Sequence, residues 1–83
     1  MSMTPQADAL TAVFAQVRKS LLGKPMALEV LEAYEEDSRS GRMNVTRLQG
    51  FLQGLSAGGA LLYEDYCEVE AILINASIYD AKR

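Results

Sequence analysis

The stretch that decides the fold lies at residues 60–83 and reads ALLYEDYCEVEAILINASIYDAKR. It contains no proline or glycine, and its apolar residues recur at steps of three and four, as they do in a helix that packs against a neighbour. The first apolar row holds Leu62, Tyr66, Val69, Leu73 and Ala76. We therefore expect one long helix over about residues 60–80, whose first row contributes to the protein's own core.

A second apolar row lies more than roughly 90° around the same helix, at about 100° per residue. It holds Tyr63, Cys67, Ala71, Ile74 and Ile78. One neighbouring wall cannot cover both rows, and a chain of 83 residues has few other elements to do so. We identify the second row as a candidate protein-binding surface. Three interpretations remain open, namely burial in the protein's own core, pairing with a second copy, and docking on a different protein.

Three shorter helices are predicted upstream. Pro5 and Pro25 suit the first position of a helix, where no backbone N–H is needed, and Thr4 and Asn44 suit the capping position. The predicted helices cover about residues 5–22, 25–37 and 45–57. Short connections favour antiparallel neighbours. The sequence thus predicts a single all-α domain over residues 1–83, either a small four-helix bundle or an orthogonal helical array with a long C-terminal helix.

Three consecutive carboxylates, Glu35, Glu36 and Asp37, end the second predicted helix. Negative charge at the C-terminal end of a helix opposes the helix dipole and costs about 0.3 to 1 kcal/mol per residue at the surface. Two interpretations follow. The carboxylates form either a solvated face balanced by Arg39 and Arg42, or a docking patch for a basic partner.

Glycines stand at four-residue steps in the third predicted helix, at Gly50 and Gly54, and Gly58 follows them. A glycine inside a helix costs about 1 kcal/mol relative to alanine, so the two interior ones need a reason. Their stripe either allows close approach of the C-terminal helix or of a partner helix, or it is tolerated on a solvent-facing side. We include Gly50 and Gly54 among the candidate protein-binding residues.

The sequence lacks the residues that most catalytic and metal sites use. It has no histidine, and its single cysteine, Cys67, excludes an internal disulfide and suits an inert thiol in a reducing compartment. No phosphate-binding loop, dinucleotide fingerprint or nucleophile elbow is present. We therefore expect no enzymatic activity, no cofactor and no metal site.

The segment from Glu36 to Arg47 resembles a degenerate EF-hand loop, with Gly41 at the sixth position. Its twelfth position holds Arg47, where calcium needs a bidentate carboxylate, so we expect no calcium binding. The helices on either side also suggest a helix-turn-helix, in which Arg39, Arg42 and Arg47 would approach DNA. Eleven acidic against eight basic residues, a net charge of −3, argue against nucleic acid as the main partner.

These observations favour a small acidic protein-interaction module of the cytoplasm. The N-terminus shows no secretory signal pattern, and no apolar run reaches the ~20 residues of a membrane span. We expect a non-enzymatic regulator, inhibitor or adaptor that docks on a larger protein of unknown identity. The alternative is an obligate homodimer that serves as a structural or assembly element, and a DNA-binding regulator is a third hypothesis.

Overall fold

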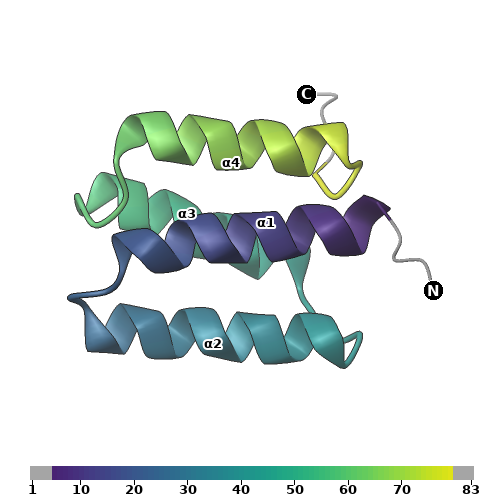
Figure 1. The fold of residues 1–83 in the computed structure, drawn as a ribbon, viewed down its shortest axis with the longest axis horizontal. Coiled ribbons are helices and arrows are strands. Elements are labelled where there is room, and N and C mark those ends of the chain that lie inside the picture. The colour runs from purple at the N-terminus through teal and green to yellow at the C-terminus, as the bar shows by residue number, and fades with distance from the viewer. Residues whose placement is uncertain (1–4, 80–83) are drawn as a thin grey trace.

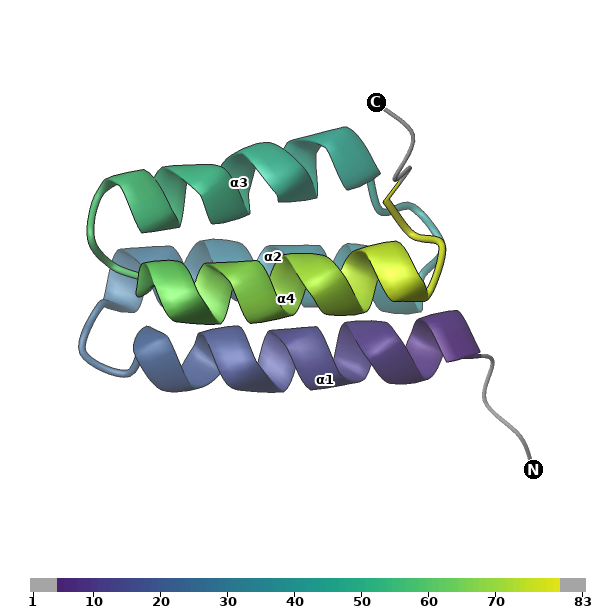
Figure 2. The same ribbon diagram turned by 90° about the horizontal axis from the view of Figure 1, so that it is seen from above.

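A computed structural model describes residues 5–79 and shows four α-helices joined by short connections. The helices are α1 (Pro5–Ser20), α2 (Pro25–Arg39), α3 (Val45–Ala57) and α4 (Tyr63–Asn75). Successive helices run in opposite directions, and their axes lie nearly side by side in both perpendicular views (Figures 1 and 2). The chain is therefore an all-α protein with an up-down-up-down bundle rather than an orthogonal array.

The upstream helices form close to the predicted positions. Helix α3 has the predicted bounds, α1 stops two residues early at Ser20, and α2 continues two residues further to Arg39. The predicted cap of α3 is confirmed, because the Asn44 side-chain oxygen accepts a hydrogen bond from the Arg47 backbone N–H at 3.0 Å. The cap proposed at Thr4 lies outside the described residues.

The expectation of a long C-terminal helix over about residues 60–80 is wrong, because α4 has only 13 residues. Leu62 has an extended backbone, with φ −62° and ψ 145°, so the helix begins at Tyr63. At the other end Ser77 takes φ 63° and turns the chain back. Both ends of α4 are thus set by backbone turns that apolar periodicity does not reveal.

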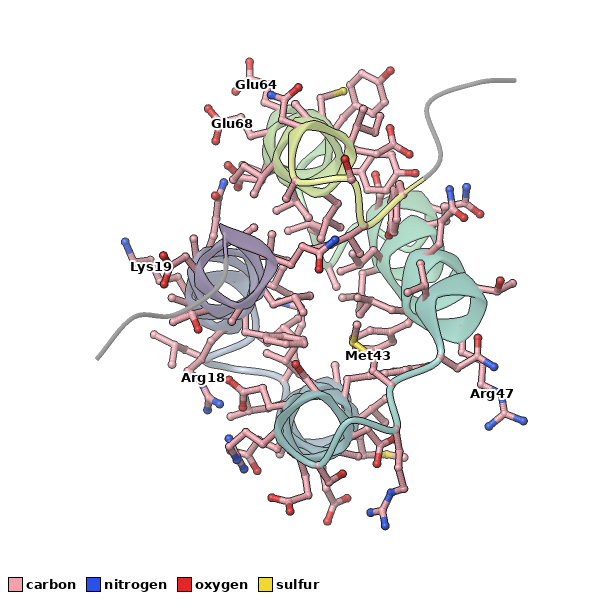
Figure 3. The ribbon with its side chains drawn as sticks, turned by 90° about the vertical axis from the view of Figure 1, so that its right-hand side faces the viewer. Arg18, Lys19, Met43, Arg47, Glu64 and Glu68 are labelled. Carbon is pink, nitrogen blue, oxygen red and sulfur yellow. The ribbon has the colours of Figure 1, made fainter. Side chains whose placement is uncertain are left out.

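The core is built from aliphatic side chains and a few rings that all four helices, two connections and the segment after α4 supply. Figure 3 looks along the bundle and shows these side chains converging between the helices, with Met43 pointing inward. No polar or charged residue in the described part of the chain is buried. The fully or almost fully buried residues are Val13, Phe14, Val17, Leu21, Leu31, Leu48, Leu52, Leu61, Val69, Leu73 and Tyr79.

The prediction that Leu62 belongs to the core is wrong. Leu62 is 67% exposed, whereas its neighbour Leu61 is only 1% exposed. Consecutive side chains of an extended segment point to opposite sides, so only one of the two leucines can face the core. Leu61 takes that place, while Val69 and Leu73 of the predicted row are buried as expected.

Helices α2, α3 and α4 each end in a Schellman motif, in which a residue with positive φ follows the helix. That residue is Gly41 in the first case, Gly59 in the second and Ser77 in the third, with φ values of 77°, 84° and 63°. In α4 the Ile78 N–H donates to the Leu73 carbonyl at 2.9 Å. The turn directs the chain back towards the core, where Tyr79 is buried.

The turn after α4 is strained at Ser77, because a residue with a Cβ atom disfavours a positive φ. We expect Ser77→Gly to raise the free energy of unfolding by about 0.5 to 1 kcal/mol, measured by urea denaturation. The reciprocal variant Gly59→Ser should lower it by a similar amount. A lower stability of Ser77→Gly would contradict the geometry described for this turn.

Candidate functional site

The exposed side of α4 gathers part of the predicted binding row. Tyr63, Cys67 and Ala71 follow one another at four-residue steps and are all exposed, with Tyr63 at 71%. Ile74 and Ile78 are half-buried and pack against the core. The structure therefore divides the row into an exposed part, which we name the α4 row (Tyr63, Cys67 and Ala71), and two residues that also serve the protein's own core.

A line of carboxylates runs beside the α4 row. Glu64 and Glu68 are exposed and point away from the bundle in Figure 3. Glu68 accepts a hydrogen bond from the side chain of Gln16 on α1 at 2.8 Å, which fixes its position. Residues 48–81 contain no lysine or arginine, so no basic side chain of this segment balances these carboxylates. The exposed side of α4 is consequently apolar along one line and negative along the next.

The tyrosines near α4 lie in three different environments. The Tyr66 hydroxyl donates a hydrogen bond to Glu70 at 2.9 Å. Desolvation is the larger cause and this hydrogen bond the smaller cause of the raised pKa of Tyr66. Tyr63 has its ring centroid 6.4 Å from that of Tyr66, and hydrogen bonding to the Cys67 thiol raises the pKa of Tyr63. The buried hydroxyl of Tyr79 has no hydrogen-bond partner, and desolvation raises the pKa of Tyr79 above its ordinary value.

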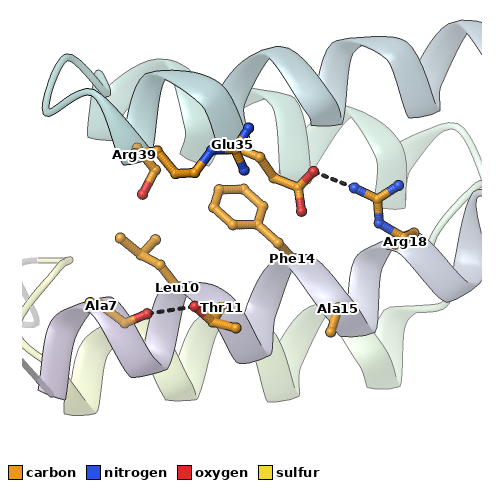
Figure 4. A pocket seen from close by; sticks show the side chains of 9 residues that line it. Ala7, Leu10, Thr11, Phe14, Ala15, Arg18, Glu35 and Arg39 are labelled. Carbon is orange, nitrogen blue, oxygen red and sulfur yellow. Dashed lines mark hydrogen bonds and ion pairs between the residues drawn. The ribbon is translucent and has the colours of Figure 1, made fainter. Parts of the chain in front are cut away.

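The carboxylates at the end of α2 do not form one surface. Glu35 is half-buried and forms an ion pair with Arg18 of α1, as Figure 4 shows. Glu36 is exposed and pairs with Arg39 at 2.7 Å, and Asp37 lines a different groove, between α2 and α3. Consecutive helix residues point about 100° apart, which explains why the three separate.

Arg18 is the counter-ion that sequence reasoning missed. It contacts Glu35 and also Glu32, whose carboxylate lies 3.1 Å from the guanidinium. Hydrogen bonding to Glu32, aided by the charges of both carboxylates, raises the pKa of Arg18. Glu32 and Glu35 are three residues apart on one side of α2, which is a signal for a shared cation. The predicted balance by Arg39 is confirmed for Glu36, whereas Arg42 forms no ion pair within residues 5–79.

Two grooves of the described chain lie between α2 and its neighbouring helices. The groove between α1 and α2, about 570 Å³, has Leu10 and Phe14 on its floor and the Arg18–Glu35 ion pair at its edge (Figure 4). The groove between α2 and α3 measures about 420 Å³ and is lined by Tyr34, Asp37 and two arginines. Within residues 5–79, no cluster of cysteines and carboxylates is arranged to hold a metal ion.

Gly50 and Gly54 lie on an exposed side of α3. A methyl group added at either position would meet no atom within 4 Å. The interpretation that α4 packs closely on these glycines is therefore wrong, because α4 contacts α3 along another side. Contact with a partner helix and tolerance on a solvent-facing side remain as interpretations of the glycine stripe.

Comparison with known proteins gives no relative from which a function could be transferred. No protein-family model matches the chain, and neither curated proteins nor solved structures gave a match. In the part of the chain that the structure covers, none of the helices has the length and apolar character needed to cross a membrane. A function must therefore be argued from the surface of this chain.

The open space around Gly50 and Gly54 has a measurable consequence. Replacing either glycine by alanine improves helix propensity without a clash, so Gly50→Ala and Gly54→Ala should each raise the free energy of unfolding by about 0.5 to 1 kcal/mol. The control Gly41→Ala should lower it, since Gly41 has a φ of 77°. Destabilisation by both helix variants would show that the stripe is packed against something in the isolated protein.

The unpartnered hydroxyl of Tyr79 predicts a specific dependence on pH. An unfolded tyrosine ionises near pH 10, whereas the raised pKa of Tyr79 keeps the folded form neutral above that pH. The contribution of Tyr79 to the free energy of unfolding is therefore fully present below about pH 10 and is lost as the pH rises further. Tyr79→Phe should remove this part of the alkaline loss and leave stability at neutral pH equal or higher by up to about 1 kcal/mol.

Urea denaturation between about pH 8 and 11 measures this effect, with Tyr34→Phe as the control. The control variant should keep the alkaline loss that the wild-type protein shows. A Tyr79→Phe variant that is less stable at neutral pH would indicate that the hydroxyl has a favourable partner.

Proposed function

We propose that this chain is a small non-enzymatic protein-interaction module that acts in the cytoplasm as a regulator, inhibitor or adaptor by docking on a larger protein. The observation that carries the proposal is the exposed α4 row of Tyr63, Cys67 and Ala71 beside the carboxylates of Glu64 and Glu68. Docking by this surface would act by steric occlusion of the partner's own contacts.

The α4 row is surplus to the protein's own folding. The core is closed by residues such as Leu61, Val69 and Leu73, which are at most 1% exposed, and none of the three row residues is among those packed against it. An exposed tyrosine next to apolar neighbours is a favourable anchor, because it buries a large area with little loss of side-chain entropy. These features support binding by the exposed side of α4 rather than a purely structural role for it.

The charge beside the row indicates the kind of partner surface. Glu64 and Glu68 are exposed, and no basic residue lies between positions 48 and 81 to neutralise them. A complementary partner carries lysine or arginine beside an apolar strip. Long-range attraction would then accelerate association, and added salt would slow it.

The two other hypotheses differ in the support that they receive. A DNA-binding role would use Arg39, Arg42 and Arg47, but Arg39 already pairs with Glu36, and acidic residues outnumber basic ones. A homodimer is favoured by a different observation, the distribution of charge at one end of the bundle. That end of the bundle includes Tyr63 of the α4 row and otherwise lies outside it.

The test replaces exposed residues only, because Asp at Ile74 or Ile78 would disturb the core that these isoleucines help to close. We expect the double variant Cys67→Arg/Ala71→Arg to keep the thermal stability of the wild-type protein. Its affinity for the partner should fall about tenfold or more. Thermal unfolding measures the stability, and affinity capture from the native cell, followed by quantitative mass spectrometry and titration of the captured protein, measures the binding.

The control is Thr46→Arg, which adds one arginine on the exposed side of α3. It should retain partner binding. If the same proteins are captured equally well with the double variant and with the control, the α4 row is not the docking surface.

A further inference from the structure

One end of the bundle collects almost all the large apolar side chains that the structure leaves exposed. The connection between α1 and α2 and the connection between α3 and α4 lie at this end in both Figures 1 and 2, and we name it the loop end. Leu22 (73% exposed) and Met26 (81% exposed) belong to the first connection and the start of α2. Leu62 and Tyr63 belong to the second connection and the start of α4.

We name these four residues the apolar cap. Scattered single apolar residues are normal on protein surfaces, whereas several gathered at one end mark a site of contact. Val30, further along α2, is the one other large apolar residue of the described chain that is exposed, at 44%. The cap is thus a localised feature and not a general property of the surface.

Charge at the loop end is divided between the two connections. Residues 9–28 contain no acidic residue and supply Lys19 and Lys24, whereas residues 48–79 contain no basic residue and supply Glu64 and Asp65. None of these four side chains forms an ion pair within residues 5–79. Lys19 and Asp65 line one groove between α1 and α4, which places the two edges side by side. Glu29, in the second turn of α2, is the nearest acidic residue on the Met26 side.

A surface with positive charge on one connection, negative charge on the other and exposed apolar side chains on both is complementary to itself after a half turn. A two-fold axis that passes between the two connections would place the α1–α2 connection of one copy against the α3–α4 connection of the other. Such an interface is isologous, so every contact occurs twice. Leu22 and Met26 would face Leu62 and Tyr63, and Lys24 would face Glu64.

From this complementarity we propose that the loop end binds a second copy of this chain, head to head, through the apolar cap and the two charged edges. The dimer leaves Cys67, Ala71 and Glu68 of each copy free, because these residues lie further along α4. The inference goes beyond the proposed function and does not require it. The two surfaces share Tyr63 and Glu64, so in the dimer a larger protein would contact α4 through Cys67, Ala71 and Glu68.

The experiment measures the dimer dissociation constant of the purified full chain by sedimentation equilibrium, with helicity and thermal unfolding followed in parallel. We expect the wild-type protein to dimerise, and we expect Leu62→Glu and Met26→Glu each to weaken dimerisation about tenfold or more. Both side chains are more than 60% exposed, so the folded monomer should survive. Cys67→Arg/Ala71→Arg, which tests the proposed function, should leave the dissociation constant unchanged.

Charge reversal tests the orientation of the two copies. Lys24→Glu and Glu64→Lys should each weaken the dimer about tenfold at low salt, because each creates two like-charge contacts in a two-fold interface. The double variant Lys24→Glu/Glu64→Lys should restore the wild-type value to within about threefold, since every contact again joins opposite charges.

Three results would overturn the inference. A wild-type chain that remains monomeric at high micromolar concentration shows that the cap is free or is covered by another protein. A dimer that persists unchanged in Leu62→Glu shows that the copies meet elsewhere. Charge reversals that fail to rescue one another show that the two connections do not face each other. Dimerisation and capture through Cys67 and Ala71 are measured separately, so either proposal can fail while the other stands.

Discussion

Burial of one aliphatic core between four short helices is the constraint on which the rest of this structure depends. Each fully buried leucine or valine contributes about 1.5 to 3 kcal/mol, and within residues 5–79 the hydroxyl of Tyr79 is the one buried side-chain polar atom without a hydrogen-bond partner. Val13 and Val17 of α1 belong to one buried cluster with Val69 and Leu73 of α4, and the cluster includes Leu61 before α4 and Tyr79 after it. The direction in which α4 faces is therefore fixed by its buried side.

Fixing the buried side of α4 also fixes what remains outside. The helix is apolar on more of its circumference than the core can cover, so Tyr63, Cys67 and Ala71 face solvent. The turn before the helix has the same effect, because only one of Leu61 and Leu62 can point inward. Both surfaces that we propose for binding, the α4 row and the apolar cap, consist of apolar residues that the small core of this chain cannot bury.

The candidate site was predictable in part. Helical periodicity correctly grouped Tyr63, Cys67 and Ala71, because residues four apart share a side of a helix. It could not separate them from Ile74 and Ile78, whose burial depends on neighbouring segments. For Glu35, Glu36 and Asp37, adjacency in sequence suggested one acidic patch, whereas adjacent residues of a helix point in different directions. The partner of Glu35 is Arg18, 17 residues away, and only the packing of α1 on α2 reveals it.

The sequence by itself determined the all-α class, the approximate positions of α1, α2 and α3 and the cap at Asn44, since these depend on interactions within a few residues. Only the tertiary structure decided the short length of α4, the exposure of Leu62, the open surroundings of Gly50 and Gly54 and the gathering of opposite charges at the loop end. The physical reason is that these features depend on how the connections turn and on which helix lies opposite, and neither is encoded in the period of a single helix.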